Sequence, residues 1–386
     1  MEEELITESP DYEKLNLQEN PFPYSPVPED LPDVYSGQQH VKNALKGTIG
    51  SAISTGKSNH LVITGKYGNG KTHTLKYAKK LVKQESDAIS GYVSQPGEGF
   101  EDIYHEFVYD LGYEFFQDLA HEYLLHVVEE YDIPIEEDIE SGEELEEAID
   151  EGEVLLSDII PPAMKDLKDK SEFADFSRAF IHLVYEDTSL YAWQWISGEG
   201  LRYEQRKEME IHTNIDDSIK AVRAFTSIKN IMQFLDYGTV CVFIDEFEAI
   251  ERLNSKQKQN VLNNLRHVID MNPQGTSIVI GCAPEVWQEV MSEYHAFSER
   301  IGKEESLRPL DREMAEKLIQ DYLETYTQDG GEVINPYTED AVEKLLEMSQ
   351  GNTRQLISLC GQCLDSIVKA DETEVTAQTV EKAVGR

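Results

Sequence analysis

The sequence predicts an α/β protein built on a parallel sheet with helices on both faces. Short, uniformly apolar runs at 61–63, 240–244 and 277–281 have the length and composition of buried parallel strands. Segments with helical periodicity separate these runs along the chain. A glycine-rich loop at 65–72 directly follows the first run. Strands that alternate with helices in this way are typical of sheets wound with helices on both sides.

The glycine-rich loop has the pattern of a phosphate-binding loop. It fits G-x-x-x-x-G-K-[ST], with a strand before it and a helix after it, and this context argues against an ordinary glycine-rich turn. Backbone N–H groups of such a loop surround an anion, and the helix N-terminus adds partial positive charge. We expect Lys71 to reach the β- and γ-phosphates and the Thr72 hydroxyl to bind Mg²⁺. The nucleotide-binding residues are therefore predicted to be Gly65, Lys66, Tyr67, Gly68, Asn69, Gly70, Lys71 and Thr72.

An acidic pair, Asp245 and Glu246, follows the run at 240–244. Carboxylates at the end of a buried strand are costly without partners, and the carboxyl ends of parallel strands are where ligands bind. Beside a phosphate loop, we expect Asp245 to hold Mg²⁺ directly or through water. Glu246 is expected to orient and deprotonate the attacking water. A helix cap is the alternative interpretation of the pair taken alone.

The chain is predicted to have four parts. Residues 1–36 are polar and proline-rich, which indicates an extended arm. A nucleotide-binding core is expected to be interrupted by a mostly helical insertion at 114–213, and the region 309–386 has an all-helical pattern. The core then comprises residues 37–113 and 214–308.

The net charge of −41 is unevenly distributed along the chain. Residues 84–164 contain 25 Asp or Glu and no Lys or Arg. A solvated acidic helix or loop is one interpretation of this stretch. The other is a docking surface for a basic protein partner, or a shield that repels nucleic acid. No block of the chain is strongly basic, so charge does not indicate DNA binding, although a few lysines in an oligomer could contact DNA.

These motifs resemble those of the AAA+ ATPases, and among them the origin-recognition/Cdc6-like branch. The resemblance rests on the phosphate loop, the pair Asp245-Glu246, and Gly351-Asn352-Thr353-Arg354, which is similar to the second sensor of that family. It implies ATP as the nucleotide, a helical lid at 309–386, and Arg354 reaching the γ-phosphate from that lid. An exposed arginine at a helix start is the alternative interpretation of Arg354. The strand end Ile280-Gly281-Cys282-Ala283 lacks the polar residue usual at the first sensor, which puts the positioning of water there in question.

The segment 297–301, Phe-Ser-Glu-Arg-Ile, resembles the arginine-finger region of the same family. By this resemblance Arg300 acts in trans on the ATP of a neighbouring subunit, where a planar guanidinium suits phosphate oxygens. A surface ion pair is the alternative for Arg300, and Arg308 or Arg266 could take the role instead. The segment 192–199, Ala-Trp-Gln-Trp-Ile-Ser-Gly-Glu, is similar to ATP-binding proteins of BREX-type phage-defence systems.

Three functions follow from these observations. The first is an ATP-hydrolysing switch that assembles with itself or with partner proteins, in phage defence or a mobile element. The second is a DNA-loading or transposition helper ATPase, and the third is a scaffold that binds ATP without hydrolysing it. No secretory signal or apolar run of about 18 residues is visible. We therefore expect a cytoplasmic protein with no membrane contact.

Overall fold

The fold is described from a computed structural model. The description covers residues 11–23, 31–85, 87–131, 133, 141–171, 173–328 and 330–384. The centre of the predicted acidic stretch, residues 134–140, and the prolines at 26 and 28 of the predicted arm lie outside this part of the chain.

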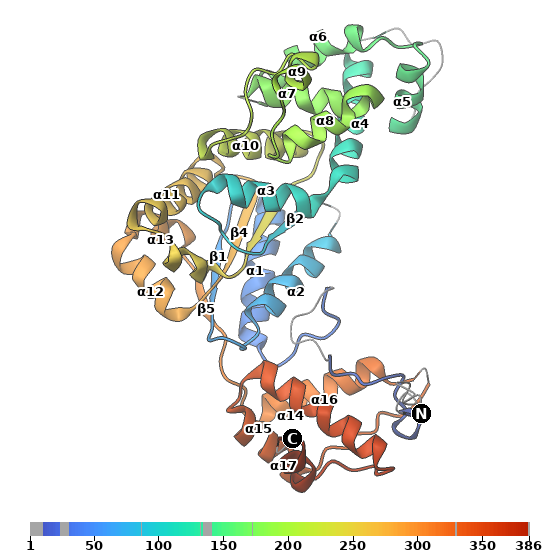
Figure 1. The fold of residues 1–386 in the computed structure, drawn as a ribbon, viewed down its shortest axis with the longest axis vertical. Coiled ribbons are helices and arrows are strands. Elements are labelled where there is room, and N and C mark those ends of the chain that lie inside the picture. The colour runs from blue at the N-terminus through green and yellow to red at the C-terminus, as the bar shows by residue number, and fades with distance from the viewer. Residues whose placement is uncertain are drawn as a thin grey trace, which may run out of the picture. The chain divides into compact units, whose positions relative to one another are not determined.

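A five-stranded sheet with helices around it confirms the predicted α/β class (Figure 1). The strand order is β2-β3-β4-β1-β5, and β2, β3 and β4 pair in parallel. The strands are β1 (Leu61–Thr64), β2 (Ala88–Val93), β3 (Thr239–Ile244), β4 (Thr276–Cys282) and β5 (Glu304–Ser306). Three of them coincide with the apolar runs of the sequence, and the short β5 was not predicted.

Most of the described chain is helical. The helices of the nucleotide-binding core are α1 (Gln39–Thr55), α2 (Lys71–Lys83), α3 (Phe100–Leu111), α10 (Ser218–Phe234), η3 (Phe247–Arg252), α11 (Ser255–Met271), α12 (Pro284–Glu293) and α13 (His295–Ile301). Between α3 and α10 lie α4 (Tyr113–Glu130), α5 (Gly142–Asp150), α6 (Leu156–Leu167), α7 (Ala174–Ile181), η2 (His182–Val184), α8 (Glu186–Ile196) and α9 (Tyr203–Glu208). The N- and C-terminal helices are η1 (Glu13–Leu15), α14 (Arg312–Tyr326), α15 (Glu339–Ser349), α16 (Thr353–Lys369) and α17 (Ala377–Val384).

The central strand β3 is buried along its whole length because its side chains are apolar on both faces. Its β-branched residues Val240, Val242 and Ile244 suit an extended backbone. Helices α3, α10 and α11 pack their apolar side chains over β3 and β4. A strand covered in this way points its carboxyl end, and the residues that follow it, out of a rigid core.

The chain divides into two compact units. One consists of Met1–Ala44, Ile63–Lys80 and Glu305–Arg386, and the other of Leu45–Val62 and Leu81–Glu304. The first unit contains the phosphate loop and the C-terminal helices, and the second contains β2, β3, β4 and the insertion.

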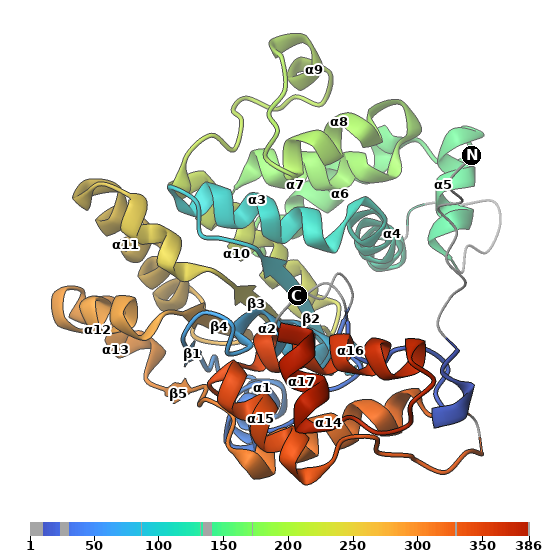
Figure 2. The ribbon, with the colours of Figure 1, turned by 60° about the horizontal axis from the view of Figure 1, so that its bottom comes forward.

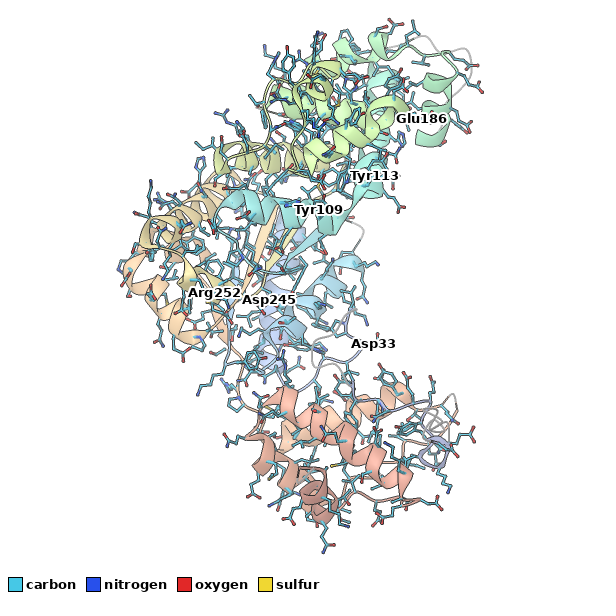
Figure 3. All side chains as sticks on the ribbon, viewed as in Figure 1. Asp33, Tyr109, Tyr113, Glu186, Asp245 and Arg252 are labelled. Carbon is cyan, nitrogen blue, oxygen red and sulfur yellow. The ribbon has the colours of Figure 1, made fainter. Side chains whose placement is uncertain are left out.

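The helical insertion belongs to the second unit and shares its hydrophobic core (Figure 1). Helix α4 follows α3 after Gly112, and Tyr109 and Tyr113 lie on either side of this junction (Figure 3). Trp193 contacts both tyrosine rings, with centroids 5.6 and 5.9 Å away. Trp195 is fully buried and donates to the Thr213 carbonyl at 2.7 Å. The two tryptophans therefore serve as packing anchors of the insertion.

The first unit has a separate hydrophobic core formed by α14 to α17 and by the N-terminal segment (Figure 2). Phe22 is 1% exposed, and its ring centroid lies 5.4 Å from that of Tyr322 and 5.9 Å from that of Tyr337. Asn20 donates to the Gly361 carbonyl at 3.0 Å. The segment 12–22 is thus an integral part of the C-terminal helical domain, a packing role that its proline-rich composition did not indicate.

Candidate nucleotide-binding site

The phosphate loop, residues 65–72, connects β1 to α2 as the sequence predicts. Gly68 and Gly70 have φ angles of 81° and 93°, which only glycine adopts without strain. The Asn69 N–H donates to the Lys66 carbonyl at 3.1 Å and closes a tight turn inside the loop. Such a turn directs successive N–H groups toward one point, which is the geometry that binds phosphate.

Lys71 and Thr72 form the first turn of α2. The Lys71 ammonium donates to the Gly65 carbonyl at 3.0 Å, and the residue is only 9% exposed. Thr74 holds α2 against the loop, since its N–H and hydroxyl reach the Gly70 carbonyl at 2.9 and 2.7 Å. Lys71 and Thr72 therefore lie at a helix N-terminus, where the partial charge is positive.

The start of α16 contacts the phosphate loop within the same unit. The Asn352 amide donates to the Tyr67 carbonyl at 2.8 Å, and the Arg354 N–H donates to the Gly68 carbonyl at 3.1 Å. The Arg354 guanidinium lies over the Tyr67 ring and donates to its hydroxyl at 2.6 Å. Asn352 and Arg354, from the motif that resembles a second sensor, thus lie beside the phosphate loop.

Asp245 follows the carboxyl end of β3 and is 2% exposed (Figure 3). The Tyr92 hydroxyl, on the neighbouring strand β2, donates to Oδ2 of Asp245 at 2.7 Å. The Glu246 N–H donates to Oδ1 at 2.8 Å. Burial and the nearby Asp245 carboxylate hold the pKa of Tyr92 well above its usual value, so its hydroxyl stays a proton donor. The buried carboxylate is therefore fixed through both oxygens.

Glu246 differs from its neighbour in being exposed, with φ 43° and ψ 40°. This left-handed conformation is uncommon outside glycine and often marks functional positions. It turns the chain sharply from β3 into η3. Glu248, in the first turn of η3, accepts a hydrogen bond of 3.1 Å from the Ala283 N–H at the end of β4. A carboxylate thereby reaches the strand end where the sequence lacks the expected first-sensor polar residue.

Arg300, the predicted trans-acting arginine, lies in α13 and pairs with Asp270 of α11, Nε to Oδ1 at 2.7 Å. Arg266 approaches the same carboxylate at 3.3 Å. The hydrogen bond from Arg300 and the two positive charges hold the pKa of Asp270 below its usual value. The alternative candidate Arg308 is exposed. Arg300 and Arg266 therefore both pair with Asp270 of the same chain. A surface ion pair is the alternative that the sequence analysis left open for Arg300.

Two further residues, Tyr92 and Glu248, have positions at the strand ends that the sequence analysis did not assign. Glu248 was visible within Asp245-Glu246-Phe247-Glu248, but its link to β4 depends on the turn made at Glu246. The hydroxyl of Tyr92 is a polar group in a strand next to the central one. That signal could have identified it only if the strand register were known.

The description "BREX system ATP-binding protein BrxC/D" is that of the family whose sequence model matches residues 26–329. The chain belongs to this family. The match covers most of the chain and includes both the phosphate loop and the pair Asp245-Glu246. Membership therefore agrees with a nucleotide-binding function for the loop and with the BREX resemblance drawn from residues 192–199.

Two solved structures are similar to this chain in fold. The ORC2 protein of Aeropyrum pernix, in ADPNP and ADP complexes, is 13% identical with a TM-score of 0.51, covering 95% of this chain and 70% of that one. At this identity the likeness shows the fold alone, that of an origin-recognition AAA+ ATPase. RuvB of Thermotoga maritima is also similar, 13% identical with a TM-score of 0.43, covering 93% and 72% of the two chains.

One curated relative is an uncharacterized HTH-type transcriptional regulator, MJ0774, of Methanocaldococcus jannaschii. It is 24% identical over 111 residues, which are 29% of this BrxC/D-family chain. The chain spans 27% of the length of that relative. No helix among the described residues combines the length and apolar character needed to cross a membrane.

Proposed function

We propose that this BrxC/D-family protein hydrolyses ATP. The observation that carries the proposal is the contrast between two adjacent carboxylates at the end of β3. Asp245 is buried and hydrogen-bonded through both oxygens, whereas Glu246 is exposed. A fixed carboxylate suits a metal ion, and an exposed neighbour suits a water molecule that must enter and leave. Different environments thus give two acidic residues two separate roles.

In this proposal the phosphate loop binds the triphosphate through its backbone N–H groups, and Lys71 reaches the β- and γ-phosphates. Thr72 and Asp245 would hold Mg²⁺, and they fit this ion because a hydroxyl and a carboxylate are the hard oxygen ligands that it prefers. When bound, Mg²⁺ would neutralise negative charge on the phosphate oxygens. Glu246 accepts a proton from the water that attacks the γ-phosphorus, and ADP and phosphate leave.

We further propose that nucleotide binding switches the arrangement of the C-terminal helical domain. The contacts of Asn352 and Arg354 with the phosphate loop support this step, because they join the loop to α16. With ATP bound, Arg354 contacts the γ-phosphate, and loss of that phosphate removes one partner of the guanidinium. Arg300 would act on ATP in a neighbouring subunit after exchanging Asp270 for phosphate oxygens.

The biological setting proposed is phage defence, in a complex with other proteins of a BREX system. Family membership supports this setting. The acidic stretch at 84–164 suits a basic protein partner, since its net charge is −25 and oppositely charged surfaces attract one another.

Phosphate release by the purified chain tests the proposal. Glu246→Gln keeps the size and hydrogen-bonding capacity of the side chain but cannot take up a proton, so hydrolysis should fall at least about tenfold. ATP binding, measured by calorimetry, should survive in this variant and be lost in Lys71→Ala. Equal hydrolysis by Glu246→Gln and the unmodified chain would show that another group activates water. Binding without hydrolysis by the unmodified chain would favour the scaffold alternative.

A further inference from the structure

Tyr67 places a large aromatic side chain in the phosphate loop, and this side chain is 79% exposed. Phosphate binding by such a loop depends on backbone N–H groups and on the lysine, and it requires no aromatic ring. Among the described residues, the ring contacts Arg354 of the C-terminal helical domain. These contacts indicate that the ring acts on Arg354 and not on the conformation of the loop.

Arg354 contacts both polar and apolar parts of Tyr67. Its guanidinium carbon lies 4.8 Å from the ring centroid, within the range of a cation–π contact. One of its N–H groups donates to the Tyr67 hydroxyl at 2.6 Å. The ring limits the height of the guanidinium above the loop, and the hydroxyl limits its direction. A guanidinium has five N–H donors, so a bond to Tyr67 leaves capacity for phosphate oxygens.

Hydrogen bonds to two backbone carbonyls of the phosphate loop hold the start of α16 beside that loop. Asn352 donates to the Tyr67 carbonyl at 2.8 Å and accepts from the Gln355 N–H at 3.1 Å, capping α16. The backbone N–H of Arg354 donates to the carbonyl of Gly68 at 3.1 Å. A side chain on Gly68 would place its Cβ 2.5 Å from the Asn352 amide. The close approach of loop and helix therefore depends on a glycine at 68.

We propose that Tyr67 is a positioning residue that directs the Arg354 guanidinium toward the terminal phosphate of bound ATP. The inference rests on the proposed function, since it requires that the loop binds ATP. The Tyr67 side chain then contributes to the distinction between ATP and ADP through Arg354, while the backbone N–H groups of the loop bind the phosphates. ADP lacks the γ-phosphate that Arg354 contacts, so its binding does not depend on how Arg354 is directed.

The experiment compares affinities of the full chain for ADP and for the non-hydrolysable β,γ-imido analogue of ATP, by calorimetry with Mg²⁺. Tyr67→Leu removes the ring and hydroxyl and should weaken binding of the analogue about tenfold. Tyr67→Phe keeps the ring and should weaken it about threefold. ADP affinity should stay within about twofold in both variants, since both keep the backbone N–H groups and Lys71 that bind the ADP phosphates. Tyr326→Phe, which removes a tyrosine hydroxyl elsewhere in the same unit, is the matched control.

A double variant separates positioning from simple packing. If Tyr67 acts through Arg354, then Tyr67→Leu in an Arg354→Ala background should cause no further loss of analogue binding. Additive losses, or an equal loss for ADP, would overturn the inference. An unchanged ratio of the two affinities in Tyr67→Leu would also overturn it. If the unmodified chain binds neither nucleotide, the proposed function itself fails, and this outcome is distinct from the others.

Discussion

The hydroxyl of Tyr92 donates a hydrogen bond of 2.7 Å to the carboxylate of Asp245. The two residues lie at the carboxyl ends of the neighbouring parallel strands β2 and β3. A buried carboxylate is costly unless it is hydrogen-bonded, and here one donor comes from the next strand. The sheet therefore fixes Oδ2 of Asp245, while the Glu246 N–H in the turn after β3 holds Oδ1.

Tyr92→Phe is predicted to raise the Mg²⁺ concentration that phosphate release requires. The variant keeps the ring but removes the donor to Oδ2, so the Asp245 carboxylate is less firmly directed. The Mg²⁺ concentration for half-maximal phosphate release should rise roughly tenfold. Unfolding free energy should fall by about 1–3 kcal/mol, because a buried acceptor loses its partner. A magnesium titration of phosphate release and a urea unfolding curve measure the two effects.

Tyr109→Phe is the control for this prediction, because Tyr109 also donates to a carboxylate, that of Glu199, but in an exposed position. It should leave the magnesium requirement unchanged. If Tyr92→Phe lowers stability and the magnesium requirement stays as in the unmodified chain, Tyr92 supports only the fold.

Arg300 provides a prediction about assembly. Lys71→Ala subunits are expected to lose ATP binding but keep Arg300, whereas Arg300→Ala subunits bind ATP but lack the trans-acting guanidinium. Mixing the two should restore part of the phosphate release that each lacks alone. Asp270→Asn weakens the ion pair that holds Arg300 and should not reduce activity in the assembled state. Mixed subunits with no more activity than the separate ones would exclude the trans role.

Much of the fold could be predicted from local patterns. Residues 240–244 of β3 are uniformly apolar, as suits a strand covered on both faces, and this pattern distinguishes the run from a surface helix. The region 309–386, predicted to be helical, contains α14 to α17. The capping residues Asp311 and Asn352 mark the starts of α14 and α16. Local sequence determines such features directly.

The parts that were not predicted depend on contacts distant in sequence. Phe22 lies in a proline-rich segment whose composition indicates a loop, and its burial depends on rings about 300 residues away. The bond between Tyr92 and Asp245 depends on which strands are neighbours, and the chain between them includes the whole insertion. Spacing along the sequence carries no information on either pairing.

The packing of Phe22 predicts that the N-terminal segment stabilises the C-terminal helices. Phe22→Ala should lower the free energy of unfolding by about 3–5 kcal/mol, as expected when a buried aromatic ring is truncated. The thermal unfolding of α14 to α17 should shift to lower temperature. Phe115→Ala, a substitution of a partly buried ring in the insertion, should leave that transition in place. An unchanged transition in Phe22→Ala would mean that the segment is not packed in solution.

His60 predicts a pH dependence of stability. It is 5% exposed, and its Nδ1 accepts a hydrogen bond of 3.1 Å from the Ile278 N–H of β4. Burial lowers the pKa of His60 from 6.5 to about 4. A protonated ring would lose its acceptor at Nδ1, so the folded protein favours the neutral form.

The sign of the effect follows from this lowered pKa. Below about pH 6.5 the unfolded chain binds a proton at His60 that the folded chain does not, so folding becomes less favourable as pH falls toward 4. The contribution of neutral His60 to the free energy of unfolding is fully present above pH 6.5, and about 3 kcal/mol of it is lost by pH 4. His60→Asn keeps an acceptor without titrating, so it should lack this loss. Urea unfolding at several pH values measures the difference between the two proteins, and parallel curves would show that His60 is not the titrating group.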